Sequence, residues 1–177
     1  MKLSRNLEAA LIFDHLGETL RAAEAPASQT SEESAVVALR TFLQKNALPA
    51  DEVRLEEGSG MSRNNLVTAN ATVALLRFMA AHRYAKDFAD SLPIAGVDGT
   101  LRRRLKGTPA EGNVRAKTGT LRYAHCLSGY VTSAAGEKLV FSLMLNRHVA
   151  PPDRTARDEL DDIAAMLARF AGQSGTP

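Results

Sequence analysis

The sequence lacks several features that define broad classes of protein. Cys126 is the only cysteine among 177 residues, so no disulfide can form within the chain and a disulfide-stabilised scaffold is excluded. No apolar run reaches the roughly 20 residues that a membrane-spanning helix needs. Tryptophan is absent and the other aromatic residues are few, yet 45% of the residues are hydrophobic. A domain with a largely aliphatic core is therefore expected.

Charge is nearly balanced. Lysine and arginine number 22 and the acidic residues 20, which gives a net charge of +2 and argues against a dedicated nucleic-acid binder. The histidines are scattered without the spacing of metal ligands, so no metal site is expected; they are His15, His82, His125 and His148.

The N-terminal residues do not resemble a secretory signal. Residues 1–6 lead directly into apolar residues at helical spacing, and Glu8 and Asp14 interrupt the apolar stretch that a signal requires. We therefore expect no export signal in this chain.

Hydrophobic periodicity predicts an α+β domain over residues 1–177, with helices first, then three antiparallel strands, then a helix packed on them. The expected caps are Ser4 or Asn6 for the first helix, Thr30 for the second, Asp98 for a short helix and Asp153 for the last. The expected helices span 5–20, 30–45, 69–83 and 100–106, and a last helix follows residue 153. A single helical turn is expected at 87–94. The expected strands span 53–56, 114–121, 127–132 and 138–146, the last apolar enough for burial on both faces.

Residues 114–121 carry the chemistry around which the chain is organised. Lys117, Thr118 and Gly119 are consecutive in a predicted strand, so a cation, a hydroxyl and a position without a Cβ occur together. The lysine can act near a reacting centre, the threonine can hold a carboxylate, and the glycine allows a substrate backbone to approach. Lys-Thr-Gly is a motif of penicillin-binding proteins and class A β-lactamases, although a single tripeptide is a weak signal.

A second segment strengthens the first. Residues 57–66 contain a glycine-rich loop followed by Ser62-Arg63-Asn64, a Ser-x-Asn pattern upstream of Lys117. Taken alone, Ser62 and Asn64 have an alternative reading as a turn and helix cap, and Lys117-Thr118-Gly119 as an ordinary strand end.

Together these segments resemble the D-alanyl-D-alanine carboxypeptidase/endopeptidase family of penicillin-binding proteins. Residues 57–67 are similar to the family's Ser-x-Asn segment, and 98–101, 114–121 and 127–131 to its later segments. Ser4-Arg5-Asn6-Leu7 resembles the helix ahead of the Ser-x-Asn loop. The resemblance implies a β-lactamase/transpeptidase-like fold, an antiparallel sheet flanked by helices, of which this chain is the C-terminal portion.

The family's serine nucleophile, in Ser-x-x-Lys, has no counterpart here, because no serine of the chain has a lysine three residues later. We therefore expect an incomplete peptidase domain, from a split or truncated gene or from expression of only part of a longer protein. Glu57, where the family commonly has aspartate, and the bulky residues 122–125 are smaller departures.

By resemblance, the reaction is acyl transfer at a peptide bond between two D-alanines. Ser62 passes a proton to the leaving amine, Lys117 polarises that hydroxyl, and Asn64 binds the substrate amide. Thr118 holds the terminal carboxylate, beside Gly119, and the backbone N–H of Thr120 forms half of an oxyanion hole. No metal or organic cofactor is implied.

The implied partners are peptidoglycan stem peptides ending in D-Ala-D-Ala and, for the complete enzyme, β-lactams. The implied location of the complete protein is the periplasm, and an exposed sheet edge favours self-association. The alternative function is a noncatalytic protein that keeps the cleft for binding or scaffolding. The basic run at 102–106 is interpreted as a solvated helix face or as a contact with anionic cell-wall polymer. Cys126 is expected to be a buried strand residue, and His125 is expected to have a structural role.

Overall fold

The computed structural model describes residues 1–173 and forms two compact units. The helical unit is Arg5–Leu75. The sheet unit combines Met1–Ser4 with the chain from Leu76 onward. Each unit is built largely from segments adjacent in sequence, except that the first four residues belong with the sheet.

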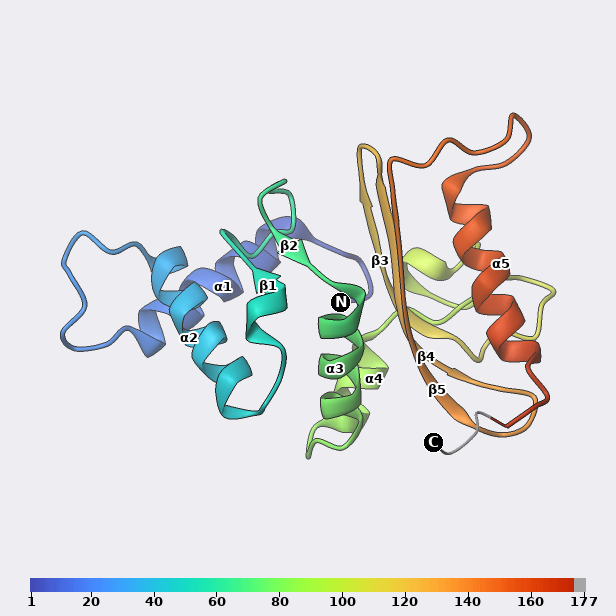
Figure 1. Cartoon of the computed structure of the whole chain (residues 1–177), viewed down its shortest axis with the longest axis horizontal. Helices are drawn as coiled ribbons and strands as arrows, with labels where there is room; N and C mark the ends of the chain where they lie inside the picture. The colour runs from blue at the N-terminus through green and yellow to red at the C-terminus, as the bar shows by residue number, and fades with distance from the viewer. Residues whose placement is uncertain (174–177) are drawn as a thin grey trace. The chain divides into compact units, whose positions relative to one another are not determined.

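The helical unit is built on two helices, α1 (Asn6–Leu20) and α2 (Ser31–Lys45), which pack against each other (Figure 1). Their contact is close because α1 has a glycine there: a Cβ on Gly17 would lie 1.8 Å from the carbonyl oxygen of Ser31. The predicted capping box is confirmed at the start of α2, where the Thr30 and Glu33 side chains bond each other's backbone N–H groups. The predicted cap of α1 is wrong, because its N-cap is Arg5 with no side-chain hydrogen bond.

The rest of this unit is a short antiparallel pair of strands. A turn of 3-10 helix, η1 (Ala50–Glu52), leads into β1 (Val53–Arg54), which pairs with β2 (Leu66–Val67). The helix α3 (Ala69–Ala80) follows, and the boundary between the two units falls within it. The strand predicted over 53–56 is therefore shorter than expected, and the loop between β1 and β2 carries Ser62 and Asn64.

The sheet unit contains an antiparallel meander in the order β3-β4-β5. Its strands are β3 (Arg115–Leu121), β4 (Ala124–Thr132) and β5 (Lys138–Asn146). Two short elements, α4 (Ala85–Ser91) and η2 (Gly99–Leu101), precede the sheet, and α5 (Ala156–Arg169) follows it. In the register, Lys117 lies opposite Ser128, and Ser128 opposite Ser142.

The main core lies between the sheet and α5, which crosses one sheet face (Figure 1). Leu160, Ala164 and Ala168 of α5 pack in the same buried cluster as Leu127 and Phe141 of the sheet. Small side chains on α5 allow the helix backbone to approach the strands closely, and burial of this surface is the main stabilising term.

Several local expectations are corrected by the structure. The helix expected over 100–106 is only the single turn η2, and Leu105 has a left-handed backbone with φ of +61°. Asp98 does not cap η2 with its side chain, and α5 is capped by Thr155 rather than Asp153. The strand at 138–146 is confirmed, but most of its residues are only half-buried.

The predicted α+β class, with helices beside an antiparallel sheet, is confirmed. Within the part of the chain that the structure describes, no helix combines the length and apolar character needed to cross a membrane.

Candidate active site

Strand β3 holds the Lys117–Thr120 segment in extended form, so alternate residues face opposite sides of the sheet. Ala116 is fully buried in the cluster with α5. Lys117 and Gly119 therefore project from the sheet face opposite that cluster. The strand thus presents its half-buried lysine away from the main core.

The outer edge of β3 is only partly used. Segment 93–95 pairs with its beginning: Ala116 N–H donates to the Pro93 carbonyl at 3.0 Å, and Ala95 N–H to the Val114 carbonyl at 2.9 Å. Among the described residues, no strand other than β4 pairs with β3. From Lys117 onward, this edge has the form that accepts an extended peptide.

The Lys117 ammonium donates hydrogen bonds to the hydroxyl of Ser4 at 2.6 Å and to the Thr118 carbonyl at 2.7 Å. Burial lowers the pKa of Lys117, because the charged form loses water. The Ser4 oxygen accepts from Lys117, which leaves its own O–H as a donor. A lysine and a serine are thus directly linked in the sheet unit.

Ser4 adopts an unusual backbone conformation, with φ of +50°. A non-glycine residue rarely takes this region, and such strain concentrates at functional positions. The turn of residues 1–4 is closed by the Ser4 N–H, which donates to the Met1 carbonyl at 3.2 Å.

The neighbouring threonines differ in their contacts. The Thr118 hydroxyl donates to the Thr100 hydroxyl at 2.8 Å, so it is oriented by the η2 turn. Gly119 and Thr120 are exposed. A Cβ on Gly119 would meet Cys126 at 3.4 Å, an ordinary contact, so the fold itself does not require glycine there.

The Ser62 and Asn64 side chains lie in the helical unit and share a partner. The Ser62 hydroxyl and the Asn64 amide both donate to a carboxylate oxygen of Glu56, each at 3.0 Å. The Asn64 N–H donates to the Ser62 hydroxyl oxygen at 3.1 Å. Each therefore has a local role in the turn, which agrees with the structural reading of this segment.

Glu57 organises the rest of that loop. Its carboxylate accepts from the N–H groups of Ser59 at 2.6 Å and of Gly60 and Ser62 at 3.0 Å, and from the Asn65 amide at 2.9 Å. Burial alone would raise the pKa of Glu57, but these bonds outweigh it and lower the pKa to about 2.

The structure thus brings Lys117 together with a serine that the sequence interpretation did not assign to the site. Ser4-Arg5-Asn6 has the same Ser-x-Asn form as Ser62-Arg63-Asn64. This repeated pattern is the available sequence signal for Ser4, although residues 4–7 also resemble the family's helix ahead of the Ser-x-Asn loop. The predicted network of Ser62, Asn64 and Lys117 joins residues of two units and stays a prediction.

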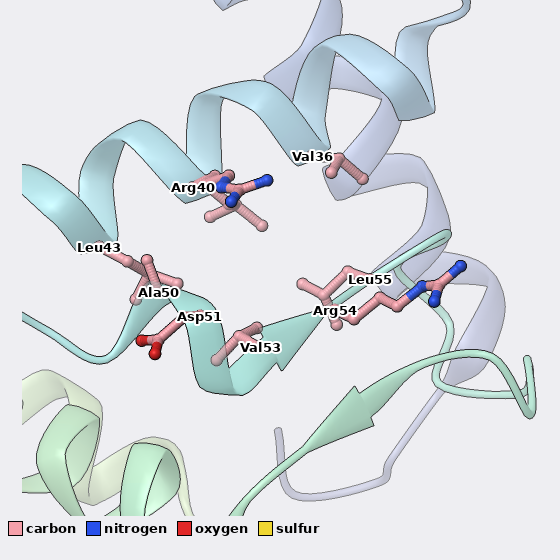
Figure 2. Close-up of a pocket in the computed structure, with 9 residues that line it drawn as sticks. Val36, Arg40, Leu43, Ala50, Asp51, Val53, Arg54 and Leu55 are labelled. Carbon is pink, nitrogen blue, oxygen red and sulfur yellow. The ribbon is translucent and has the colours of Figure 1, made fainter.

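Other features of the described chain do not add to this site. A hollow of about 300 Å³ in the helical unit lies between α2 and residues 50–55, and none of the predicted site residues lines it (Figure 2).

No group of histidine, cysteine and acidic side chains in residues 1–173 is arranged to hold a metal ion. The Nδ1 atom of His125 is buried without a hydrogen-bond partner among these residues. Burial raises the pKa of the Cys126 thiol, which suits an inert strand residue.

A lysine-serine pair on an open strand edge with the Lys-Thr-Gly motif is typical of serine acyl-transfer enzymes of the penicillin-binding class. The family model described as D-Ala-D-Ala carboxypeptidase 3 (S13) matches residues 1–167. The chain belongs to this family. The expected family and its transpeptidase-like fold are therefore confirmed.

Individual relatives agree. The D-alanyl-D-alanine carboxypeptidase of Actinomadura sp. (strain R39) is 39% identical over 177 residues, which cover 97% of this chain and 31% of the relative. Penicillin-binding protein 4 of Haemophilus influenzae is 31% identical with a TM-score of 0.81, covering 96% of this chain and 38% of that one. A structure of the same protein carries a β-lactam. A predatory endopeptidase of Bdellovibrio bacteriovorus, 21% identical with a TM-score of 0.63, shares the fold. The chain spans about a third of the length of the Actinomadura relative.

Proposed function

We propose that this chain is part of a serine-type D-alanyl-D-alanine carboxypeptidase/endopeptidase that acts on peptidoglycan stem peptides. The chain contributes Lys117 and the Lys-Thr-Gly strand to the active site of that enzyme. It forms the C-terminal portion of a penicillin-binding domain. The observation that carries the proposal is the 2.6 Å hydrogen bond from Lys117 to Ser4, on a strand that bears Lys-Thr-Gly.

In this proposal Ser4 and Lys117 form the proton-transfer pair. A serine nucleophile, in a Ser-x-x-Lys segment outside these 177 residues, attacks the carbonyl of the penultimate D-alanine. As the acyl bond forms, the proton of the attacking serine passes to the lysine of its own Ser-x-x-Lys segment. The C–N bond breaks, the leaving amine takes a proton from the Ser4 hydroxyl, and Lys117 returns a proton to Ser4. The proton held by the Ser-x-x-Lys lysine then restores the charge of Lys117. Water then hydrolyses the acyl ester. The lowered pKa of Lys117 suits it to this exchange.

The remaining predicted residues bind substrate. Thr118 holds the terminal carboxylate, and Gly119 lets the peptide lie along the open edge of β3. The Thr120 N–H contributes to the oxyanion hole. Ser62 and Asn64 are the second candidates for the proton donor and the amide-binding group, and the experiment below separates Ser62 from Ser4.

The proposed location of the complete protein follows from its proposed substrate. Peptidoglycan lies outside the cytoplasmic membrane, so the complete protein acts in the periplasm and is a target for β-lactams. Because β5 pairs on one side only within the described sheet, the isolated chain associates with itself through that edge.

The test uses a fluorescent penicillin and denaturing electrophoresis. The 177-residue chain should form no covalent band, because it has no Ser-x-x-Lys serine. A fusion that places the preceding segment of the Actinomadura carboxypeptidase ahead of Met1 should form one. Ser4→Ala should slow this acylation about 100-fold, whereas Ser62→Ala should leave it near the original rate.

Three outcomes would contradict the proposal. A stoichiometric band on the chain alone would show that it carries its own nucleophile. A fusion that folds but is not acylated would favour the noncatalytic binding protein. A loss in Ser62→Ala with an unaffected Ser4→Ala would return the proton-transfer role to Ser62.

A further inference from the structure

The turn Asp98-Gly99-Thr100 contacts both the N-terminal residues and strand β3. The Asp98 carboxylate pairs with the Lys2 ammonium and accepts from the Ile94 N–H at 2.8 Å. Both side chains of the ion pair are about one-third exposed. Burial would raise the pKa of Asp98, but the hydrogen bond from Lys2 and that from Ile94 lower it.

Gly99 brings the turn against the backbone of residue 2. Its φ is +56°, and a Cβ at this position would lie 2.6 Å from the Lys2 carbonyl oxygen and 3.1 Å from Cβ of Pro93. Both the conformation and the space require glycine. The close approach lets the Thr100 N–H donate to that Lys2 carbonyl at 3.1 Å.

Thr100 also reaches the strand. Its hydroxyl accepts from the Thr118 hydroxyl at 2.8 Å, while its N–H holds Lys2. One residue therefore connects the segment that carries Ser4 with the strand that carries Lys117 and Thr118. All these residues belong to the sheet unit.

We propose that Asp98, Gly99 and Thr100 form a positioning clamp: Asp98 and Gly99 hold Lys2 so that the Ser4 hydroxyl stays on the Lys117 ammonium, and the Thr100 hydroxyl orients Thr118. Its catalytic consequence rests on the proposed function.

Ser4 needs such an external support. Its left-handed backbone conformation is unfavourable for serine, and α1 begins at Asn6 with no side-chain cap to fix the preceding residues. Lys2 is held at two points: its side chain pairs with Asp98, and its carbonyl oxygen accepts from Thr100 at the place where Gly99 allows the close approach. Fixing residue 2 restricts residue 4, because only one residue separates them.

The first test measures the pKa of Lys117 in the 177-residue chain and does not depend on any enzymatic reaction. The lysine side-chain resonances are followed by NMR through a pH titration, with Lys117 assigned by substitution. Asp98→Asn and Gly99→Ala should each raise the pKa of Lys117 towards its ordinary value. When Ser4 is released, water reaches the Lys117 ammonium, stabilises its charged form and takes the place of the Ser4 hydroxyl as hydrogen-bond acceptor. Loss of the Asp98 charge alone acts in the opposite direction, so the sign separates the two causes.

Matched variants complete this test. Thr100→Val keeps the N–H that holds Lys2 and should leave the Lys117 pKa unchanged. Asp90→Asn removes a carboxylate that pairs with Lys86 and Arg115 in the same unit, and should not raise it. Lys2→Arg should leave the Lys117 pKa as in the original chain, whereas Lys2→Met should raise it as much as Asp98→Asn does. The double variant of Lys2→Met and Asp98→Asn should show the same pKa as either single variant. An unchanged or lowered Lys117 pKa in both Asp98→Asn and Gly99→Ala would overturn the clamp.

The second test uses the acylating fusion described above. Asp98→Asn should lower the acylation rate constant about tenfold with little change in penicillin binding, because only the proton-transfer pair is displaced. Thr100→Val should mainly weaken binding, through the misplaced Thr118 hydroxyl. If the fusion is inert, the proposed function fails but the NMR result still decides the clamp. If the fusion reacts and both variants match it, the clamp alone is wrong.

Discussion

Gly129 of β4 lies directly against the backbone of β3, where a Cβ would stand 2.1 Å from the carbonyl oxygen of Arg115 and 2.6 Å from Cα of Ala116. Backbone atoms cannot yield as a flexible side chain can. The close approach fixes β3 immediately before Lys117.

Substituting Gly129 by alanine should therefore destabilise the sheet unit, by about 1–3 kcal/mol as for other overpacked core positions. Gly119→Ala is the matched control in the neighbouring strand, because its Cβ meets only an ordinary contact. Urea unfolding followed by circular dichroism should show a lower midpoint for Gly129→Ala and little change for Gly119→Ala. Equal decreases in the urea midpoint of the two variants would mean that the close approach of the β3 and β4 backbones is not the reason why residue 129 is glycine.

Arg104 and Asp161 should be a stabilising pair rather than part of a solvated basic face. The Arg104 guanidinium donates to both carboxylate oxygens, at 2.7 and 3.1 Å, and the two side chains are only 17% and 18% exposed. Arg104→Met leaves a largely buried carboxylate without its partner and should cost about 2–3 kcal/mol. Arg103→Ala, an exposed change in the same run, should stay within about 0.5 kcal/mol in the same thermal unfolding experiment.

Ser4 offers a way to separate backbone strain from chemistry. Ser4→Gly and Ser4→Ala both remove the hydroxyl that Lys117 contacts, but glycine tolerates the φ of +50°. The glycine variant should be more stable than the alanine variant by about 1 kcal/mol, measured by urea unfolding of the chain. Both should be equally slow in acylation of the fusion. A glycine variant that reacts like the original would remove Ser4 from the mechanism.

The Glu57 loop should give the helical unit an acid sensitivity. The pKa of Glu57 is lowered to about 2, so its carboxylate contributes stability above the ordinary glutamate pKa near 4.5 and loses it as pH falls through 2. Glu57→Gln should cost about 1 kcal/mol near neutral pH, a figure limited by solvent screening. The difference in urea midpoint between the two proteins should shrink as pH falls through that window. A constant difference would show that the charge is not what the loop uses.

Sequence patterns predicted most elements because their signals are local. The apolar run at 138–146 lies between a glycine turn and a break, and the structure has the strand at those residues. Strand β4 begins three residues earlier than expected because Arg122 and Tyr123 form a two-residue turn, with Tyr123 at φ of +66°. A tyrosine gives no turn signal in the sequence.

The site was only half predictable for the same reason. Lys117-Thr118-Gly119 is a contiguous motif, so it was found, whereas its link to Ser4 joins residues 113 positions apart. Asp98 was expected to cap a helix, but it bonds Lys2 and Ile94 instead. Such pairings depend on how distant segments fold together, which no local pattern encodes.

The clamp has a consequence for the order of folding. The α1–α2 hairpin and the β3–β4–β5 meander join segments adjacent in sequence, so their loop-closure entropy is small and they form early. The contacts of Lys2 and Ser4 close loops of 96 and 113 positions. During synthesis the first four residues emerge before every partner they bind, and they must wait until β3 has left the ribosome. The lysine-serine pair is therefore expected to be the last part of the sheet unit to assemble and the first to come apart.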